Sequence, residues 1–390
     1  MPISWLKKVT SIIGLVMLVA ACTDGTPPPQ IEAKPYAYTA PKYTGDGWQV
    51  GHLADFNINQ QAILDLVSRI SRGTHPGIDS LTIVKNNTLL LHENFRTEFS
   101  EYDSWVNNTD LNLHVMHSTS KSIVSALVGI AKQQGFIGNI QTPLLQFFDY
   151  PEYENWDPGK NDITLENTLT MQLGLEWDEW NFPYEDTRNS LHAIVYNHSD
   201  YIKAMLDLPM TSKPGEVYAY NTIASIALGA VIERATGYQL EDFAEQFLFE
   251  PLQISEAHWL ETPDGFANTG SGLFLKTRDM AKFGQLFLDG GVWNGLQIIE
   301  RDWIDRSLEK SVTLDWSYTS GYGYQWWLGE FLVNEQVIPF YSTRGFGGQF
   351  IIVVPGYDLV LAFTAHNYDN GLYDSPFSLT EKYILPAITQ

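Results

Sequence analysis

The stretch His117-Ser118-Thr119-Ser120-Lys121 opens an apolar run over residues 123–131, and this run is expected to decide the fold. Its length and composition predict a buried helix that begins near Ser118. Residues three apart share a helix face, so the Lys121 ammonium group is expected beside the Ser118 hydroxyl. The free N–H groups of the first turn can hold a negatively charged oxygen. The pattern therefore predicts nucleophilic acyl transfer, with Ser118 as nucleophile and Lys121 as its base.

The same Ser-x-x-Lys spacing occurs at two further places, so the spacing alone does not identify a site. Ser4 and Lys7 lie in an N-terminal segment that is expected to be removed. Ser307 and Lys310 stand among acidic residues with little apolar sequence around them. Only Ser118 opens a long apolar helix. A capping serine with a surface lysine is the alternative interpretation of that pair.

Residues 1–21 are typical of a secretory signal, because a basic start is followed by an apolar core and small residues. The sequence from Leu18 to Cys22 resembles the lipobox of bacterial lipoproteins, and this resemblance implies that Cys22 carries lipid. Thr23 follows instead of aspartate, which implies export to the outer membrane, on its periplasmic or surface side. The alternative is an ordinary signal peptide with an incidental cysteine.

The composition of the chain limits the kinds of partner and metal site that it can have. The net charge of −23 over 390 residues would repel nucleic acid, so we expect no nucleic-acid partner. Cys22 is the single cysteine, which excludes an intramolecular disulfide, and the nine histidines form no HExxH motif, so no metal site is expected. Prolines make residues 22–50 a semi-rigid spacer, so the membrane contact is expected through the lipid anchor.

The body of the chain begins with a helix predicted over Gln60–Arg72 and a hairpin of residues 81–84 and 88–91. Asn86 and Asn87 tolerate positive φ in its turn. Two strands alone are unstable, and further strands are predicted near the other end of the chain, at 322–328, 349–354 and 359–365. We therefore expect an antiparallel sheet built from both chain ends.

The middle of the chain is expected to be mainly helical, with its clearest helices at Ser225–Thr236 and Thr277–Asp289. The predicted organisation is a sheet domain made of residues 51–115 and 311–390, with the helical domain 116–310 inserted between them. Flanking helices would cover the sheet, which gives an α/β (α+β) fold.

Ser118 to Lys121 and four further stretches form an ordered set of five sequence motifs. They are, in order, Ser118 to Lys121, LENTLTMQLGLEWDE (165–179), PGEVYAYNTIASIALGAVIERATG (214–237), GLFLKTRDMAKFGQLFLDG (272–290) and TRGFGGQFIIVVP (343–355). Together they resemble the β-lactamase-related serine hydrolases, which include class C β-lactamases, DD-peptidases, several esterases and 6-aminohexanoate-dimer hydrolase. The resemblance runs from about residue 75 to 365. It implies the β-lactamase/transpeptidase-like fold and an acyl-enzyme on Ser118, with no cofactor.

The family's Tyr-x-Asn motif corresponds to Tyr220-Asn221-Thr222. The resemblance implies that Tyr220 shares the base role with Lys121 or passes the proton to the leaving group. Thr222 replaces the usual asparagine and would orient Lys121 or the substrate, which favours linear esters or amides over β-lactams. A register shifted by two residues would make Tyr218 the catalytic tyrosine.

The family's third motif, Lys-Thr-Gly or His-Thr-Gly, reads Thr343-Arg344-Gly345 here. Gly345 would allow the strand to approach the substrate closely. Phe346 would supply the second backbone N–H of an oxyanion hole, beside that of Ser118. Arg344 would bind substrate in place of the lysine, or would point into solvent if strand alternation places it there.

An aromatic cluster, Trp177, Trp180, Phe182 and Tyr184, would line the mouth of the pocket or pack on the surface. The neighbouring Asp178 and Glu179 would bind a cationic end of the substrate or be solvated. His117 is expected to pack rather than act as a base, because neighbours at a helix start point apart.

The sequence thus predicts a serine hydrolase of small-molecule esters, linear amides or peptides. One alternative is a DD-peptidase or class C-like β-lactamase, against which the missing lysine of the third motif counts. The other is a non-catalytic binding protein of the same fold, since fold membership does not prove activity.

Overall fold

The structure is a computed structural model that describes residues 36–368, 370–373 and 375–388. The predicted signal peptide, the predicted lipidation site Cys22 and the first part of the predicted spacer lie outside these residues.

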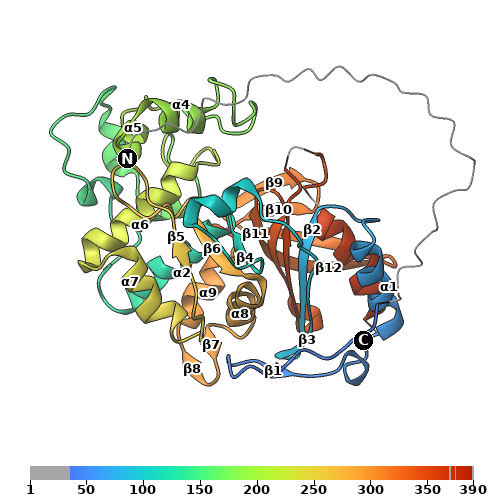
Figure 1. The fold of residues 1–390 in the computed structure, drawn as a ribbon. Coiled ribbons are helices and arrows are strands. Elements are labelled where there is room, and N and C mark those ends of the chain that lie inside the picture. The colour runs from blue at the N-terminus through green and yellow to red at the C-terminus, as the bar shows by residue number, and fades with distance from the viewer. Residues whose placement is uncertain (1–35, 369, 374, 389–390) are drawn as a thin grey trace, which may run out of the picture. The chain divides into compact units, whose positions relative to one another are not determined.

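A large sheet forms the centre of the described part of the chain, and both of its ends contribute strands (Figure 1). In the order β1-β3-β2-β14-β13-β12-β11-β10-β9, neighbouring strands are antiparallel, apart from the short parallel pair β1 and β3. This arrangement confirms the predicted sheet built from both chain ends. The strands are β1 (Gln49–Val50), β2 (Ile78–Lys85), β3 (Thr88–Asn94), β9 (Val312–Trp316), β10 (Thr319–Tyr322), β11 (Trp327–Val333), β12 (Gln336–Gly345), β13 (Gln349–Val354) and β14 (Leu359–Ala365).

The predicted hairpin is the β2–β3 pair, and its turn residues Asn86 and Asn87 have φ values of 50° and 55°. The strands predicted at 349–354 and 359–365 are β13 and β14. The prediction of one strand over 322–328 was wrong, because β10 ends at Tyr322 and β11 begins at Trp327, with Gln325 at φ 61° between them. Apolar residues on both sides of this turn made the two strands look continuous.

Most of the helices lie between the two groups of strands. They are α2 (Thr119–Gln133), α3 (Leu165–Leu169), α4 (Ser190–Asn197), α5 (Tyr201–Leu206), α6 (Thr222–Thr236), α7 (Leu240–Ala244), α8 (Thr277–Leu288) and α9 (Arg301–Ser307), with α1 (Gln60–Ser71), α10 (Ser375–Leu379) and α11 (Leu385–Ala387) nearer the chain ends. Short strands accompany them, namely β4 (Leu113–Val115), β5 (His258–Trp259) and β6 (Leu273–Lys276) in one small sheet and β7 (Val292–Trp293) with β8 (Leu296–Gln297) in another.

The two faces of the large sheet bury side chains against different helices, as the alternation along β13 illustrates. Ile351 and Val353 belong to the core shared with α2, α6 and α8, whereas Phe350 and Ile352 belong to the core that includes α1 and the C-terminal helices. Helix α8 lies very close to the sheet, because a Cβ on Gly284 would come within 2.7 Å of Ile351. Figure 1 shows α8 and α1 on opposite sides of the strands.

The segment that precedes α1 packs on this body, so the predicted spacer does not extend to residue 50. Trp48 is fully buried, and the Tyr38 hydroxyl donates to the carbonyl of Leu90 at 2.8 Å. Asp46 forms an ion pair with Arg278 at the start of α8. Aromatic burial outweighs the spacer-like proline content here. Within the described ranges, the structure contains no helix of the length and apolarity that a membrane crossing requires.

Candidate active site

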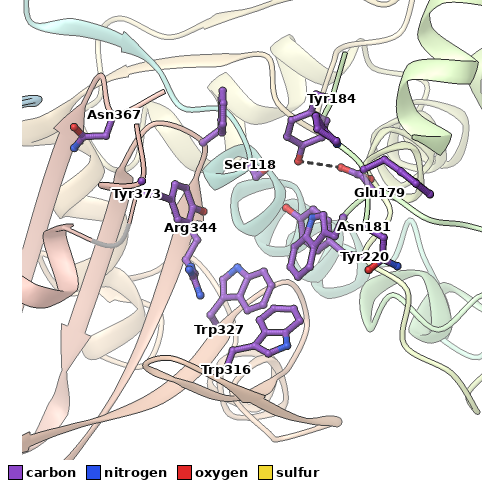
Figure 2. A pocket seen from close by; sticks show the side chains of 15 residues that line it. Ser118, Glu179, Asn181, Tyr184, Tyr220, Trp316, Trp327, Arg344, Asn367 and Tyr373 are labelled. Carbon is purple, nitrogen blue, oxygen red and sulfur yellow. Dashed lines mark hydrogen bonds between the residues drawn. The ribbon is translucent and has the colours of Figure 1, made fainter. Parts of the chain in front are cut away.

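The predicted nucleophile lies where two parts of the fold meet. Ser118 is the residue before the first turn of α2, and it faces a pocket between the sheet and the loop of residues 170–189 (Figure 2). The hydroxyl of Thr119 lies 3.0 Å from that of Thr343 and donates to the carbonyl of Gln349 at 2.8 Å. These bonds fasten the start of α2 to β12 and β13, so the nucleophile and the third motif have a fixed separation.

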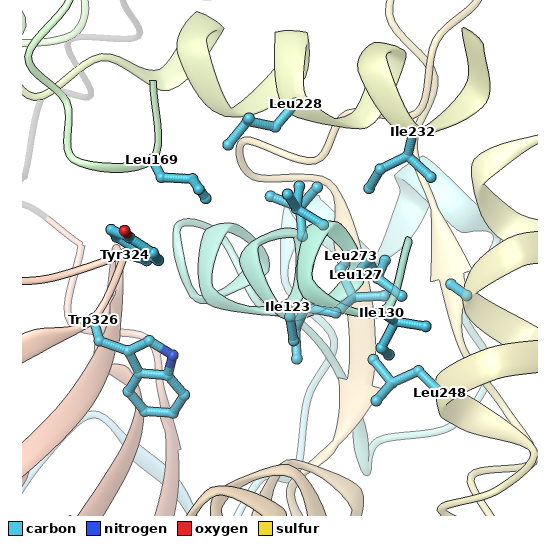
Figure 3. Packing of buried hydrophobic residues seen from close by; sticks show 14 of the residues in the cluster. Ile123, Leu127, Ile130, Leu169, Leu228, Ile232, Leu248, Leu273, Tyr324 and Trp326 are labelled. Carbon is cyan, nitrogen blue, oxygen red and sulfur yellow. The ribbon is translucent and has the colours of Figure 1, made fainter. Parts of the chain in front are cut away.

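Helix α2 is itself held rigidly, because its residues from Thr119 to Ala131 are all buried. Figure 3 shows Ile123, Leu127 and Ile130 directed toward neighbouring elements, with Leu228 and Ile232 of α6 on one side. A helix that is buried on all sides has a continuous apolar sequence, which is what the residues after Lys121 show. Its first turn therefore has little freedom to move.

Lys121 lies beside Ser118 as its spacing predicts. Its Nζ donates to Ser118 Oγ at 2.9 Å and to the carbonyl of Gly270 at 2.6 Å, and only 1% of the residue is exposed. Burial lowers the pKa of Lys121 to about 8, and the nearby Glu179 carboxylate opposes part of that fall. The lysine can therefore lose its proton close to neutral pH, as a base for the serine must.

Tyr220, rather than Tyr218, is the tyrosine at Ser118. Tyr220 lines the same pocket, its hydroxyl hydrogen-bonds with Ser118, and Lys121 Nζ lies 4.9 Å from the centre of its ring. Burial raises the pKa of Tyr220 well above its usual value, so the phenol is neutral. The Tyr218 hydroxyl is buried and has no hydrogen-bond partner among the residues that the structure describes, and its ring packs on Tyr322. The geometry thus favours the register in which Tyr220 is the motif tyrosine.

The third motif faces the pocket from β12. Gly345 is needed there, because a Cβ at this position would lie 2.2 Å from the carbonyl oxygen of Met116, just before the nucleophile. Arg344 lines the pocket, donates from its guanidinium to Thr319 Oγ1 at 3.0 Å and lies 5.3 Å from the ring of Trp327. Phe346, in the turn that follows, lines the pocket together with Ser118.

The pocket has a volume of about 600 Å³ and mostly aromatic walls. Trp180 packs at a tilt against both Tyr220 and Trp316, with ring centres 4.6 Å apart in both pairs. Trp316 belongs to the edge strand β9 and Trp327 to β11, which is separated from that edge by β10, and both lie about 140 residues along the chain from the loop that carries Trp180. The sequence did not predict either of them, because only folding brings them to the serine.

The predicted aromatic cluster is only partly at the pocket. Trp180, Phe182 and Tyr184 line it, whereas Trp177 does not. The Trp177 indole N–H donates to the carbonyl of Tyr220 at 2.7 Å and lies 3.3 Å from a Glu179 oxygen. The prediction that Trp177 contacts substrate is therefore not supported, because its one donor is used to position the catalytic segment.

Thr222 also has a different place from the predicted one. It is the first residue of α6, is 4% exposed, and donates from both its backbone N–H and its hydroxyl to Glu179, at 2.8 and 2.6 Å. Thr222 thus acts on a carboxylate rather than directly on Lys121 or the substrate. Glu179 itself is 3% exposed, so the expectation of a solvated side chain was wrong.

His117 packs among aromatic rings, as the sequence predicts. Its ring meets those of Tyr102, Phe346 and Tyr368 at centroid distances of 5.0 to 5.7 Å. Burial and the nearby Lys121 charge lower the pKa of His117 to about 3, so it stays neutral. Over the described residues, no group of three or more histidine, cysteine or acidic side chains is arranged to hold a metal ion.

The fold and this arrangement define a class of protein. The model of the Beta-lactamase family matches residues 70–375, and the chain belongs to that family. Family members include amide, ester and β-lactam hydrolases, which supports a hydrolase of the serine type.

Individual relatives are distant in sequence. The chain is 23% identical over 263 residues to 6-aminohexanoate-dimer hydrolase of Paenarthrobacter ureafaciens, with 63% of each chain covered. Among solved structures, it resembles a putative 6-aminohexanoate-dimer hydrolase from Bacillus anthracis, with a TM-score of 0.63, 20% identity and 82% of both chains covered. It also resembles a family VIII carboxylesterase, with a TM-score of 0.60, 14% identity and coverage of 85% and 96%. At these identities the likeness to solved structures establishes the fold.

Proposed function

We propose that this chain is a serine hydrolase that cleaves ester or linear amide bonds through an acyl-enzyme on Ser118. The observation that carries the proposal is the 2.9 Å contact between Lys121 Nζ and Ser118 Oγ at the buried start of α2. A serine hydroxyl in contact with a neutral lysine is an activated nucleophile, because the amine can take its proton. The hydrogen bond between Tyr220 and the same serine supports a role for Tyr220 as a second group that transfers protons, beside Lys121.

In the first half of the reaction, Lys121 Nζ takes the proton of Ser118 while Oγ bonds to the substrate carbonyl carbon. The carbonyl electron pair moves onto oxygen, where the backbone N–H groups of Ser118 and Phe346 are proposed to stabilise it. Each such donor is worth about 3 kcal/mol of barrier in comparable sites. The intermediate then expels the leaving alcohol or amine, which takes the proton back from Lys121 through Tyr220.

In the second half, water attacks the acyl carbon and gives its proton to Lys121, either directly or through Tyr220, which passes its own proton to Lys121 as it takes that of water. Collapse of this second intermediate breaks the bond to Ser118 Oγ, which recovers a proton, and releases a carboxylic acid. Side chains of the chain carry out every proton transfer in this scheme, so no cofactor is required.

The walls of the pocket support a small substrate with an apolar or aromatic acyl part. Trp180, Trp316 and Trp327 provide flat apolar surfaces, and about 600 Å³ suits a small molecule or short peptide end. The similarity to 6-aminohexanoate-dimer hydrolase supports linear amides. The second candidate, a DD-peptidase or β-lactamase, is favoured by Arg344 at the pocket, a cation near the place of the family lysine.

We further propose that Cys22 is lipidated and that the enzyme is exported and held at a bacterial membrane. The sequence from Leu18 to Cys22 supports this proposal. Incorporation of labelled palmitate into the chain, and its loss in Cys22→Ser, tests it. A wild-type chain that is exported without acquiring label would refute it.

The experiment for the activity compares p-nitrophenyl acetate and nitrocefin side by side, with the wild-type chain and its Ser118→Ala variant. Ester turnover that disappears in the variant, with nitrocefin intact, is the expected result. Nitrocefin turnover, or a penicillin adduct on Ser118 detected by mass spectrometry, would instead favour the second candidate, a DD-peptidase or β-lactamase. If neither substrate reacts and no adduct forms, the binding-protein alternative replaces the hydrolase.

A further inference from the structure

Glu179 is a buried carboxylate at the catalytic pocket that the mechanism above does not use. It lies in the loop between α3 and α4 and lines the pocket together with Ser118 and Tyr220. We infer that Glu179 is kept as a fixed negative charge that stabilises Lys121 while the lysine carries the proton of Ser118. This inference rests on the proposed function, and it makes Glu179 a positioning residue that acts through Lys121.

The hydrogen bonds around Glu179 show why it serves the lysine and not a substrate cation. Its two oxygens accept from the N–H and hydroxyl of Thr222, at 2.8 and 2.6 Å, and from the indole of Trp177 at 3.3 Å. Tyr184 adds a longer contact at 3.5 Å, drawn as a dashed line in Figure 2. The protein itself thus supplies donors to both oxygens of the carboxylate, so a ligand ammonium group would have to displace one of them.

The donors also explain why this buried carboxylate keeps its charge. A backbone N–H and an indole N–H can only donate, so they favour the ionised form. Thr222 is the first residue of the 15-residue helix α6, whose positive N-terminal end faces the carboxylate. Burial raises the pKa of Glu179, while the Lys121 ammonium and the bonds from Thr222 and Trp177 oppose that rise.

Lys121 and Glu179 interact through space and not by a shared hydrogen bond. The lysine donates to Ser118 and Gly270, and the glutamate accepts from the groups named above. Within the described ranges, the other titratable groups that face Lys121 are His117 and Tyr220, and both are neutral, because burial lowers the pKa of the first and raises that of the second. Glu179 is therefore the charge that acts on Lys121.

The arrangement has a consequence for catalysis. When Lys121 takes the proton of Ser118, a positive charge develops in a site from which water is largely excluded, and such a charge is costly without a counter-charge. A fixed carboxylate offsets that cost without moving during the reaction. The role resembles that of a third group that supports a base, here with a lysine as the base.

The test measures the pH dependence of the acylation rate with p-nitrophenyl acetate for the wild-type chain, Glu179→Gln and the control Glu176→Gln. Glu176 lies in the same loop but is exposed. In the wild type, the rate is expected to rise with pH through about 8 as Lys121 becomes neutral. Glu179→Gln removes the charge that favours the ammonium form, so the rise moves to lower pH, and the weaker base lowers the alkaline plateau about 10-fold to 100-fold. Glu176→Gln leaves the position of the rise unchanged.

A second variant keeps the test decisive if Glu179→Gln does not fold. Thr222→Val is close in shape to threonine and removes the 2.6 Å hydrogen bond to Glu179, so the rise moves in the same direction by less. If the acylation rate rises at the same pH in every folded variant, the inference about Glu179 is overturned. Turnover by the wild-type chain would still support the hydrolase in that case. A wild-type chain without turnover or acylation would overturn the proposed function itself, and the inference with it.

Discussion

The glycine of the third motif allows a quantitative test of the proposed oxyanion hole. In Gly345→Ala, the new Cβ would lie 2.2 Å from the carbonyl oxygen of Met116 and 2.9 Å from Gln349 Cβ. Unbonded carbon and oxygen atoms normally stay more than 3 Å apart, so β12 and the segment before Ser118 must separate by about 1 Å. The neighbouring residue, Phe346, would move with the strand.

A displacement of about 1 Å at a catalytic group costs about 100-fold in rate. We therefore expect Gly345→Ala to lower kcat for p-nitrophenyl acetate by about 100-fold and to destabilise the fold by about 1–3 kcal/mol, the usual cost of overpacking. Steady-state kinetics and urea unfolding measure the two effects. The control is Gly356→Ala between β13 and β14, where a new Cβ would meet no atom within 4 Å.

The outcome separates activity from stability. If Gly345→Ala folds and retains wild-type kcat, the close approach of β12 to the nucleophile does not position an oxyanion donor, and the role proposed for Phe346 is refuted. A loss of rate in Gly356→Ala would show that glycine replacement in this sheet is harmful for reasons other than the contact at Met116.

Three further predictions follow from other parts of the structure. Tyr220→Phe is expected to lower kcat in the ester assay by about 10²-fold to 10⁴-fold, as the loss of a proton-transfer group does. Tyr218→Phe removes a buried hydroxyl that has no partner among the described residues, so it is expected to leave kcat unchanged. The reverse pattern would identify Tyr218 as the catalytic tyrosine. Leu127→Ala in the fully buried part of α2 is expected to lower the free energy of unfolding by about 2–5 kcal/mol, and a loss below 1 kcal/mol in urea titrations would contradict the rigid packing of that helix. Burial acts to raise the pKa of Asp46, but the hydrogen bonds and charge of Arg278 outweigh it and lower the pKa to about 2. Since the folded pKa lies below the unfolded one, Asp46→Asn should cost about 1–2 kcal/mol at pH 7 and progressively less as the pH falls from about 4 toward 2; a constant difference across that range would contradict the ion pair.

Local sequence predicted the elements whose signals are contained within a few residues. The β2–β3 hairpin was predicted from two asparagines between apolar runs, and both have the positive φ that was expected. The contact between Ser118 and Lys121 follows from helix periodicity alone, since residues three apart meet on any helix. The predicted strand boundaries were wrong where apolar residues continue through a turn, as between β10 and β11.

The surroundings of the serine could not be predicted in this way. Glu179 stood beside Asp178 in an acidic pair, and nothing local distinguishes a buried carboxylate from a solvated one. Its partner Thr222 is 43 residues away along the chain, and the signal that could have found the pair was a helix-starting threonine in need of an acceptor. Trp316 and Trp327 likewise reach the pocket from strands β9 and β11, far along the chain from the loop that carries Trp180.

The sequence by itself thus determined the family, the hairpin, the main helices and the serine with its lysine, because each of these depends on short-range spacing or on an ordered set of motifs. Only the tertiary structure decided which tyrosine meets Ser118, that Arg344 faces the pocket, and that Glu179 is buried among Thr222, Trp177 and Tyr184. The physical reason is that burial and through-space charge depend on neighbours far apart in the chain, and packing of the sheet against the helices is what brings them together.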